Sequence, residues 1–271
     1  MISTAPHPDT IALLDFEPAL GRLLNPERAQ RARSELVARV TTLPAGPWAD
    51  RRACGVATEH VGLLVVDGVL ARETVLADIV STHLLGPGDV ARPWTSPAQD
   101  ELVPAASRWT AVTDTRVALL DRRLAMALGR YPEVNAMLID RLAEQMGRMA
   151  VAQAIGRLTG VDRRLLALFW HLAERWGRVT PDGIVVPLVL PHNVLADLVG
   201  ARRPTVSTAL RRLMTSGRVV RRADRTWLLT GAPVGRPTAD ANRVVVHRYR
   251  RPAPPRRSSR TDLYRESEAR G

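Results

Sequence analysis

The sequence predicts an α+β protein with a strand-rich N-terminal part, one long helix and a compact helical C-terminal part. Three observations lead to this prediction. Short apolar runs cut by Gly, Pro and Asp fill residues 41–121, a long helical pattern follows Pro132, and two short amphipathic helices precede a hairpin before residue 231. The 271 residues leave room for two domains, at roughly 100–200 residues each. Hydrophobic residues make up 45% of the chain, so each domain can bury a core.

The first domain is predicted at residues 14–122. Residues 14–38 have a helical pattern, and Asn25 before Pro26 is a favourable start for a helical segment. From residue 41 to 121, short runs rich in Val, Leu and Thr alternate with turns such as GPGD at 86–89. This texture indicates the strands of a small β-barrel or sandwich.

The long helix belongs to a segment predicted at residues 123–160. Pro132 stands at its first turn and Gly160 just beyond its end. At about 40 Å, such a helix is long for a globular domain. One face repeats apolar residues at steps of three or four: Val134, Leu138, Leu142, Met146 and Met149. A stripe of this kind is a packing surface, and the length of the helix favours the same helix of a second chain as its partner.

Residues 161–231 are predicted to form a winged helix-turn-helix. A buried helix closes at Trp176-Gly177, and a helix, a tight turn at Gly200 and a second helix follow. Pro204 marks the start of the second helix, because proline is tolerated only in a first turn. The inner faces of the two helices are apolar: Val194, Leu195, Leu198, Val199, Val206, Leu210 and Leu213. The segment RVVRRADRTWLL then indicates a hairpin that turns near Ala223-Asp224.

The charge of the chain points to a polyanionic partner. The formal net charge is +12, every basic residue is arginine, and many arginines follow residue 200. Arginine can bind guanine with two hydrogen bonds, and Ser or Thr reach bases or phosphates without bulk. We therefore predict that double-stranded DNA is the partner. Residues outside the inner face of the second helix, with one in the wing, are the predicted contacts: Arg202, Arg203, Thr205, Ser207, Thr208, Arg211, Arg212 and Arg225.

The order of these parts resembles the Crp/Fnr family of bacterial transcription regulators. The resemblance rests on LLGPGDV, LLALFWHLAERWG and LADLVGARRPTVSTALRRLMTSGRV and covers roughly residues 14–231. It implies a homodimer joined along the long helix, with a cyclic-nucleotide-binding-type barrel that senses a signal. It also implies that Arg203 reads a base and that His192 and Asn193 contact phosphate. Pro204 and Thr208 replace an acidic residue and a second arginine of the family pattern, so the family's usual operator is not assumed.

The sensor domain departs from the family's nucleotide-binding pattern, and we expect no cofactor. No Gly-Glu pair follows Asp89, and Arg108 precedes Trp109 rather than a small residue. A cyclic phosphate would therefore lack its counter-charge. A single cysteine, Cys54, excludes an iron–sulfur cluster held by cysteines of one chain. Haem ligation by His60 or His83 has no supporting motif, and no metal site is predicted.

The chain carries none of the common catalytic motifs, so no enzyme activity is expected. We expect a cytoplasmic, sequence-specific regulator with no membrane segment, and RNA polymerase is a further candidate partner. Two alternatives remain open: a signalling module that binds a ligand or protein, and an architectural protein that binds DNA with weak sequence preference. Residues 232–271, rich in Pro, Arg and Ser, are predicted to be a disordered basic tail.

Overall fold

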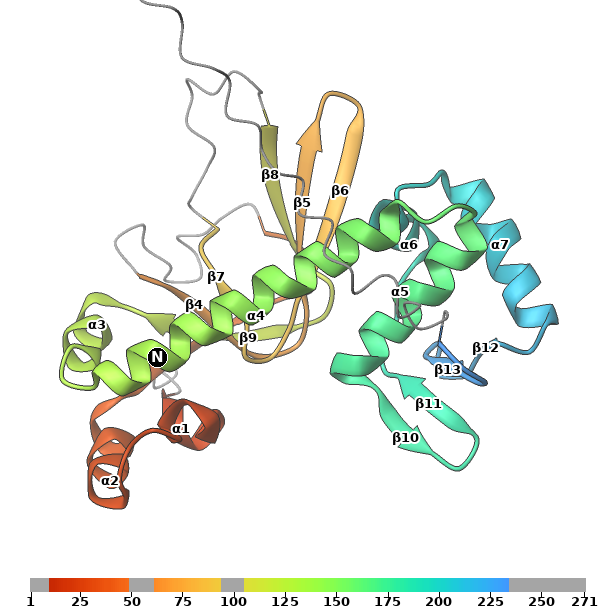
Figure 1. Cartoon of the computed structure of the whole chain (residues 1–271). Helices are drawn as coiled ribbons and strands as arrows, with labels where there is room; N and C mark the ends of the chain where they lie inside the picture. The colour runs from red at the N-terminus through yellow and green to blue at the C-terminus, as the bar shows by residue number, and fades with distance from the viewer. Residues whose placement is uncertain (1–9, 49–60, 94–104, 234–271) are drawn as a thin grey trace, which may run out of the picture. The chain divides into compact units, whose positions relative to one another are not determined.

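The computed structural model describes residues 10–48, 61–93 and 105–233 (Figure 1). All of them belong to one compact unit, Met1–Val234. Cys54 and His60 lie outside the described residues, as does nearly all of the tail predicted at 232–271. The described residues form the α+β fold that the sequence predicts.

The N-terminal segment is broken where one helical stretch is predicted. Strand β1 (Thr10–Ala12) leads into helix α1 (Leu13–Phe16), a 3-10 helix η1 (Pro18–Gly21) and helix α2 (Pro26–Glu35). The helical prediction for 14–38 is therefore wrong at its C-terminal end, where residues 37 and 38 belong to a strand, and in its interior, where the helix is interrupted before Pro18 and Pro26. The physical reason is proline, which is excluded from helix interiors and restarts the chain at Pro18 and Pro26. The predicted start at Asn25 is confirmed, because its side chain accepts the Arg28 N–H at 2.9 Å.

The β domain consists of two antiparallel sheets. The five-stranded sheet has the order β1-β2-β9-β4-β7, with β2 (Val37–Leu43), β4 (Gly62–Asp67), β7 (Val90–Ala91) and β9 (Thr115–Leu120). The four-stranded sheet has the order β3-β8-β5-β6, with β3 (Gly46–Pro47), β5 (Leu70–Leu76), β6 (Ile79–Leu85) and β8 (Ala105–Ala111). Leu63 and Val117 of the first sheet share a core with Leu70 and Trp109 of the second. The predicted barrel or sandwich is thereby confirmed.

Helices α3 (Arg122–Leu128) and α4 (Pro132–Gly156) follow the β domain (Figure 1). The predicted long helix is present, and it ends four residues before Gly160. Val134 is fully buried in the chain's own core, so it is not part of an exposed seam. Its apolar character serves packing within the chain, which the three- and four-residue spacing could not distinguish from packing between chains. The exposed apolar side chains of α4 include Ile139, Leu142 and Met146.

The C-terminal part has the predicted order of elements. Helix α5 (Val161–Trp176) precedes the hairpin β10 (Arg178–Thr180) and β11 (Gly183–Val186), then α6 (His192–Val199) and α7 (Arg203–Thr215). Strands β12 (Val219–Arg221) and β13 (Trp227–Leu229) complete a sheet of order β10-β11-β13-β12. The three helices pack on one core that also contains Val69, Ala71 and Leu84 from the β domain.

A buried ion cluster joins the β domain to the helices. Asp89, at the end of the GPGD turn, is 1% exposed and accepts the Gly86 N–H at 3.0 Å. Arg148 of α4 donates to its Oδ1 at 2.6 Å, and Arg175 of α5 donates to its Oδ2. Arg175 also donates to the carbonyl of Gly86 at 3.3 Å and stacks on the ring of Trp176. One carboxylate therefore holds together the turn 86–89, α4 and α5.

Candidate nucleic-acid interface

The turn between α6 and α7 is built around Gly200. Its backbone is left-handed, with φ 61° and ψ 52°, a conformation that glycine adopts at no steric cost. The Ala201 N–H reaches back to the carbonyl of Ala196 at 3.0 Å. Arg164 of α5 donates to the carbonyls of Val199 and Gly200, each at 3.2 Å. These bonds satisfy the free carbonyls at the end of α6 and fix where α7 begins.

The inner face of α7 anchors the helix to the domain. Val206 and Leu210 are 0% exposed, and Leu213 is 6% exposed. Behind them, Phe169 of α5 and Trp227 of β13 form an aromatic pair with ring centroids 5.0 Å apart. This buried stripe is the one predicted from the sequence, and it leaves the opposite face of α7 in solvent.

The exposed face of α7 begins with unneutralised positive charge. Arg202 is the N-cap and Arg203 the first helical residue, and both are exposed. Within the described ranges, neither forms an ion pair with a carboxylate. Thr205 is exposed beside them. A helix N-terminus adds its own partial positive charge, so this end of α7 attracts anions.

A side-chain contact joins α6 to α7 at the same end. The His192 ring Nδ1 lies 3.0 Å from Ser207 Oγ, which donates to the carbonyl of Arg203 at 3.1 Å. The direction of the His192–Ser207 bond depends on which ring nitrogen carries the proton, and the tautomer protonated at Nε2 has an N–H that can donate to phosphate. Partial burial, followed by the charges of Arg221 and Arg203, lowers the pKa of His192. Ser207, predicted as a DNA contact, is half-buried and serves first as a link between the helices.

The remaining predicted residues of the two helices lie at the surface. Asn193 is exposed on α6, and Arg211 and Arg212 are exposed on α7. Arg212 lies in the last turn, where a cation is favoured by the helix dipole. The hydroxyl of Thr208 donates to the carbonyl of Pro204 at 3.2 Å, and its lone pairs stay available to a donor.

The wing is the β12–β13 hairpin, which turns over residues 222–226. The Arg222 N–H donates to the carbonyl of Thr226 at 3.0 Å, and the Asp224 carboxylate accepts from the Thr226 N–H at 2.9 Å. The Thr226 hydroxyl also donates to this carboxylate at 2.6 Å, and this bond, followed by the one from the backbone N–H, lowers the pKa of Asp224. Arg225 has a left-handed backbone with φ 65° and an exposed side chain. The predicted turn near Ala223-Asp224 is confirmed.

Sequence reasoning missed the roles of Arg221 and Arg164. Arg221 extends over the Trp227 ring, 5.6 Å from its centroid, and its charge reaches His192. It therefore connects the wing with the start of α6. Arg164 belongs to no recognisable motif. It reaches the carbonyl of Gly200 because it lies in the first turn of α5, which packs against α6. No spacing rule finds such a residue before the packing of α5 on α6 is known.

Two charged side chains of the β domain, Arg108 and Asp89, have partners of opposite charge. Arg108 of β8 forms an ion pair with Glu73 of β5 at 3.2 Å. Asp89 is held by two arginines, as described above. Part of the segment after the GPGD turn, residues 94–104, lies outside the described residues. His83 is half-buried on β6, and burial lowers its pKa to about 4.

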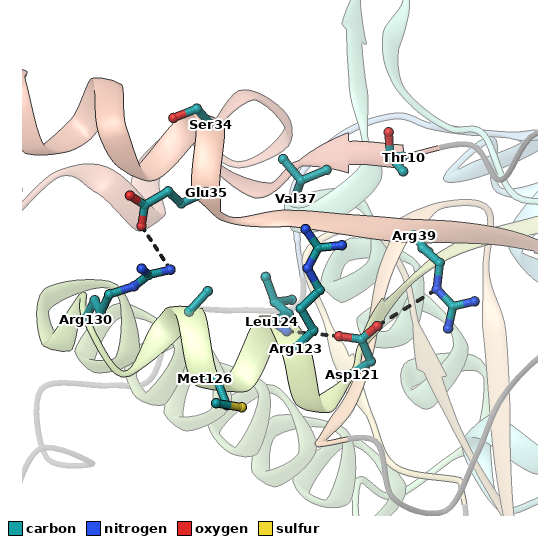
Figure 2. Close-up of a pocket in the computed structure, with 11 residues that line it drawn as sticks. Thr10, Ser34, Glu35, Val37, Arg39, Asp121, Arg123, Leu124, Met126 and Arg130 are labelled. Atoms are coloured by element: carbon teal, nitrogen blue, oxygen red, sulfur yellow. Dashed lines mark hydrogen bonds and ion pairs between the residues drawn. The ribbon is translucent and has the colours of Figure 1, made fainter.

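An open hollow lies between β1, β2, α2 and α3 (Figure 2). It measures about 950 Å³. Figure 2 shows Arg130 pointing toward Glu35 and Arg39 toward Asp121, at 3.2 and 3.9 Å. These pairs satisfy the carboxylates, and none of the buried polar atoms without a partner among the described residues belongs to the lining. We assign no ligand to this hollow.

Comparison with protein-family models gives one match. Residues 163–230 match the model of the Crp-like helix-turn-helix domain. This range contains α5, α6, α7 and the wing, which are the elements that carry the exposed arginines. These residues therefore form a Crp-like helix-turn-helix domain.

A curated protein is similar to this chain over part of its length. The "CRP-like cAMP-activated global transcriptional regulator" of Mycobacterium tuberculosis is 32% identical over 108 residues, which are 40% of this chain and 48% of that protein. The chain thus matches about half the length of this curated relative.

Solved structures of the family have the same fold. A CooA mutant from Carboxydothermus hydrogenoformans has TM-score 0.54 and 19% identity, over 72% of this chain and 84% of that chain. FixK2 from Bradyrhizobium japonicum has TM-score 0.53 and 22% identity, over 72% of this chain and 93% of that chain. Among the described residues, no helix has the length and apolar character needed to cross a membrane.

Proposed function

We propose that the protein is a cytoplasmic, sequence-specific, DNA-binding transcription regulator that acts as a homodimer. The observation that carries this proposal is the start of α7. Arg202, Arg203 and Thr205 are exposed there without acidic partners, on a helix fixed by Gly200 and flanked by a wing. A helix presented in this way can enter a major groove with its N-terminal side chains toward the base edges.

Three sets of residues have different roles in DNA binding at this surface. Arg203 reads a base, with Thr205, Thr208 and Arg211 as further readers. His192 and Asn193, at the start of α6, hold phosphate, with Arg202 beside them. Arg212 and the wing residue Arg225 add phosphate contacts farther along the backbone. Ser207 positions His192 rather than reading a base, because its hydroxyl already contacts the His192 ring and the backbone carbonyl of Arg203.

The dimer seam lies on α4. Ile139, Leu142 and Met146 are 66%, 42% and 70% exposed. They follow one another at steps of three and four residues, so they form one stripe on the helix. Leu138 and Met149 flank it and are half-buried. An apolar stripe of this length in solvent is unfavourable, and a second copy of α4 covers it with matching side chains.

The test is selection of bound duplexes from a random DNA pool, followed by salt titrations. A sequence-specific regulator yields one enriched palindromic motif, whose half-sites lie about one helical turn, or roughly 34 Å, apart. It then binds that motif far more tightly than random DNA. Equal affinity for both duplexes would favour an architectural protein, and no binding would favour a signalling module. RNA polymerase is proposed as a partner of the DNA-bound form.

A further inference from the structure

A second, smaller cavity lies where β6, α4, α5 and α6 meet. It measures about 40 Å³, and polar side chains from three elements line it among leucines. Thr82 and His83 come from β6, Arg148 from α4, and His171 and Arg175 from α5. A cavity needs about 10–15 Å³ to hold one water, so this one takes roughly three water-sized atoms.

Buried polar atoms without a hydrogen-bond partner gather around this cavity. Four such atoms belong to its lining: Thr82 Oγ1, His83 Nε2, Arg148 Nε and His171 Nδ1. The 950 Å³ hollow of Figure 2 has none among its lining residues. An arginine Nε can only donate, and a hydroxyl or a neutral imidazole can donate as well. An occupant that accepts several hydrogen bonds at once satisfies all four, whereas each unmade bond is costly.

The net positive charge around the cavity favours an anion as the occupant. Arg148 and Arg175 bring two positive charges, and the buried Asp89 carboxylate neutralises one of them. The nearest other carboxylates are largely exposed to water: Glu144 lies 4.0 Å from Arg148, and Glu174 lies 3.8 Å from His171. With both imidazoles neutral, the buried cluster has one positive charge in excess. A single monoanion balances it, and an uncompensated buried charge is unfavourable.

We propose that this cavity is a binding site for one small monoanion, of the size of chloride, nitrate or formate. The anion accepts hydrogen bonds from the four unpartnered atoms, Thr82 Oγ1, His83 Nε2, Arg148 Nε and His171 Nδ1, and it lies beside the Arg175 guanidinium that stacks on Trp176. Burial and neighbouring arginines lower the pKa of both histidines, so they meet the anion as neutral N–H donors. Polyatomic anions larger than these exceed the cavity.

The position of the site connects anion binding to DNA affinity through the helices that surround the cavity. Three of the four elements around the cavity, α4, α5 and α6, connect the proposed dimer seam to the proposed reading helix. Arg148 and Arg175 also hold Asp89 of the β domain. This regulatory extension rests on the proposed function, whereas the anion site itself does not.

The anion site is tested by thermal unfolding of the full chain in sodium salts at fixed ionic strength. Nitrate or chloride replaces gluconate, which is too large for the cavity. The melting temperature is expected to rise by about 3–6 °C when the small anion reaches roughly ten times its Kd. Identical melting temperatures in the three salts would overturn the proposal.

Variants separate the site from general salt effects. Ala152→Leu fills the cavity with methyl groups and leaves the ion pairs intact, so it should remove the anion dependence. Arg148→Gln should raise the apparent Kd for the anion at least tenfold. Asp89→Asn should lower that Kd, because Arg148 and Arg175 lose the carboxylate that neutralises one of their two charges. Arg157→Gln, an exposed change at the end of α4, is the matched control and should behave as the parent. An unchanged anion dependence in Ala152→Leu would overturn the assignment to this cavity.

The regulatory extension is measured by DNA affinity in nitrate and in gluconate at fixed ionic strength. The parent should show a difference of threefold or more, at about 0.65 kcal/mol from RT ln 3, and Ala152→Leu should show none. An anion-dependent melting temperature with equal DNA affinities would overturn the regulatory role alone. Absence of any DNA binding would contradict the proposed function and leave the anion site standing.

Discussion

Arg203 and Arg225 carry the same guanidinium on different backbones. Arg203 begins a 13-residue helix whose first turn is exposed, so its side chain extends from a fixed base toward the groove. Arg225 stands at the tip of a hairpin with a left-handed backbone, where no helix directs it. Rigid placement suits the two-bond geometry of a guanine, and a hairpin tip suits a phosphate, which accepts donors from many directions.

We therefore expect opposite effects from two alanine substitutions. Arg203→Ala should weaken the selected site by about 1–3 kcal/mol more than random DNA and relax one symmetric pair of positions. Arg225→Ala should weaken all sequences about equally and lower the salt slope by about one unit per wing contact. Equilibrium binding to selected and random duplexes at several salt concentrations measures both. Equal losses of specific and random binding in the two variants would make Arg203 a phosphate contact.

His83 gives a prediction for stability against pH. Burial lowers its pKa from 6.5 to about 4, opposed by Asp89 and assisted by Arg175, Arg148 and Arg72. The unfolded chain therefore binds a proton at pH values where the folded chain does not. Stability is fully present above pH 6.5 and falls as the pH drops toward about 4. The loss amounts to about 3 kcal/mol by pH 4, at 1.36 kcal/mol per pKa unit.

The variant His83→Gln should lack this dependence, because glutamine does not titrate. Denaturant unfolding of the parent and the variant across this pH range isolates the contribution of His83, since all other groups titrate in both. The difference between their free energies of unfolding should change by that amount as the pH falls. Parallel stability curves would show that His83 is protonated at its ordinary pKa in the folded chain.

Helix α4 has two apolar faces with different partners. Val134 and Met137 pack into the core of their own chain, and Ile139, Leu142 and Met146 point into solvent. The inner face fixes the helix on the β domain, so substitutions on the outer face do not disturb the fold. The outer face is where assembly of two chains can be tested without unfolding either.

Leu142→Arg should leave a folded monomer that binds DNA weakly. The side chain is 42% exposed in one chain, so arginine fits there, but in the seam it is an uncompensated charge facing its own copy. Sedimentation equilibrium and circular dichroism measure assembly and folding. Met126→Arg, at a 71% exposed site on α3, is the control and should stay dimeric. A stable dimer of the Leu142→Arg variant would place the seam elsewhere.

At the scale of the whole molecule, neither Arg108 of the β domain nor the two arginines around Asp89 are free to hold a cyclic phosphate. Arg108 is paired with Glu73, and Asp89 is enclosed by Arg148 and Arg175. We expect that cyclic AMP neither binds with micromolar affinity nor changes DNA affinity. Calorimetry with the purified chain tests this directly, with AMP as the matched control ligand. Heat specific to cyclic AMP would show that the nucleotide is held by residues outside the described ranges.

The sequence predicts those features that depend on neighbours in the chain. Asn25-Pro26 starts α2, Gly200 turns the backbone, and Pro204 opens α7, because caps, turns and proline act within a few residues. It does not predict the Asp89 cluster, whose partners are 59 and 86 residues away. Nor does it show that Val134 packs within the chain and Leu142 is exposed, because periodicity identifies an apolar face of a helix but not what that face packs against.

Trp227 gives the DNA-binding surface an optical reporter of its own. The indole is 1% exposed beneath the wing, and the Arg221 guanidinium lies 5.6 Å from the centre of its ring. A cation beside an indole shifts the energy of its excited state, so a displacement of Arg221 on DNA binding should change the emission of Trp227. Occupancy of DNA can therefore be followed by fluorescence without a label, and subtracting the signal of Trp227→Phe isolates this one indole from the chain's other tryptophans.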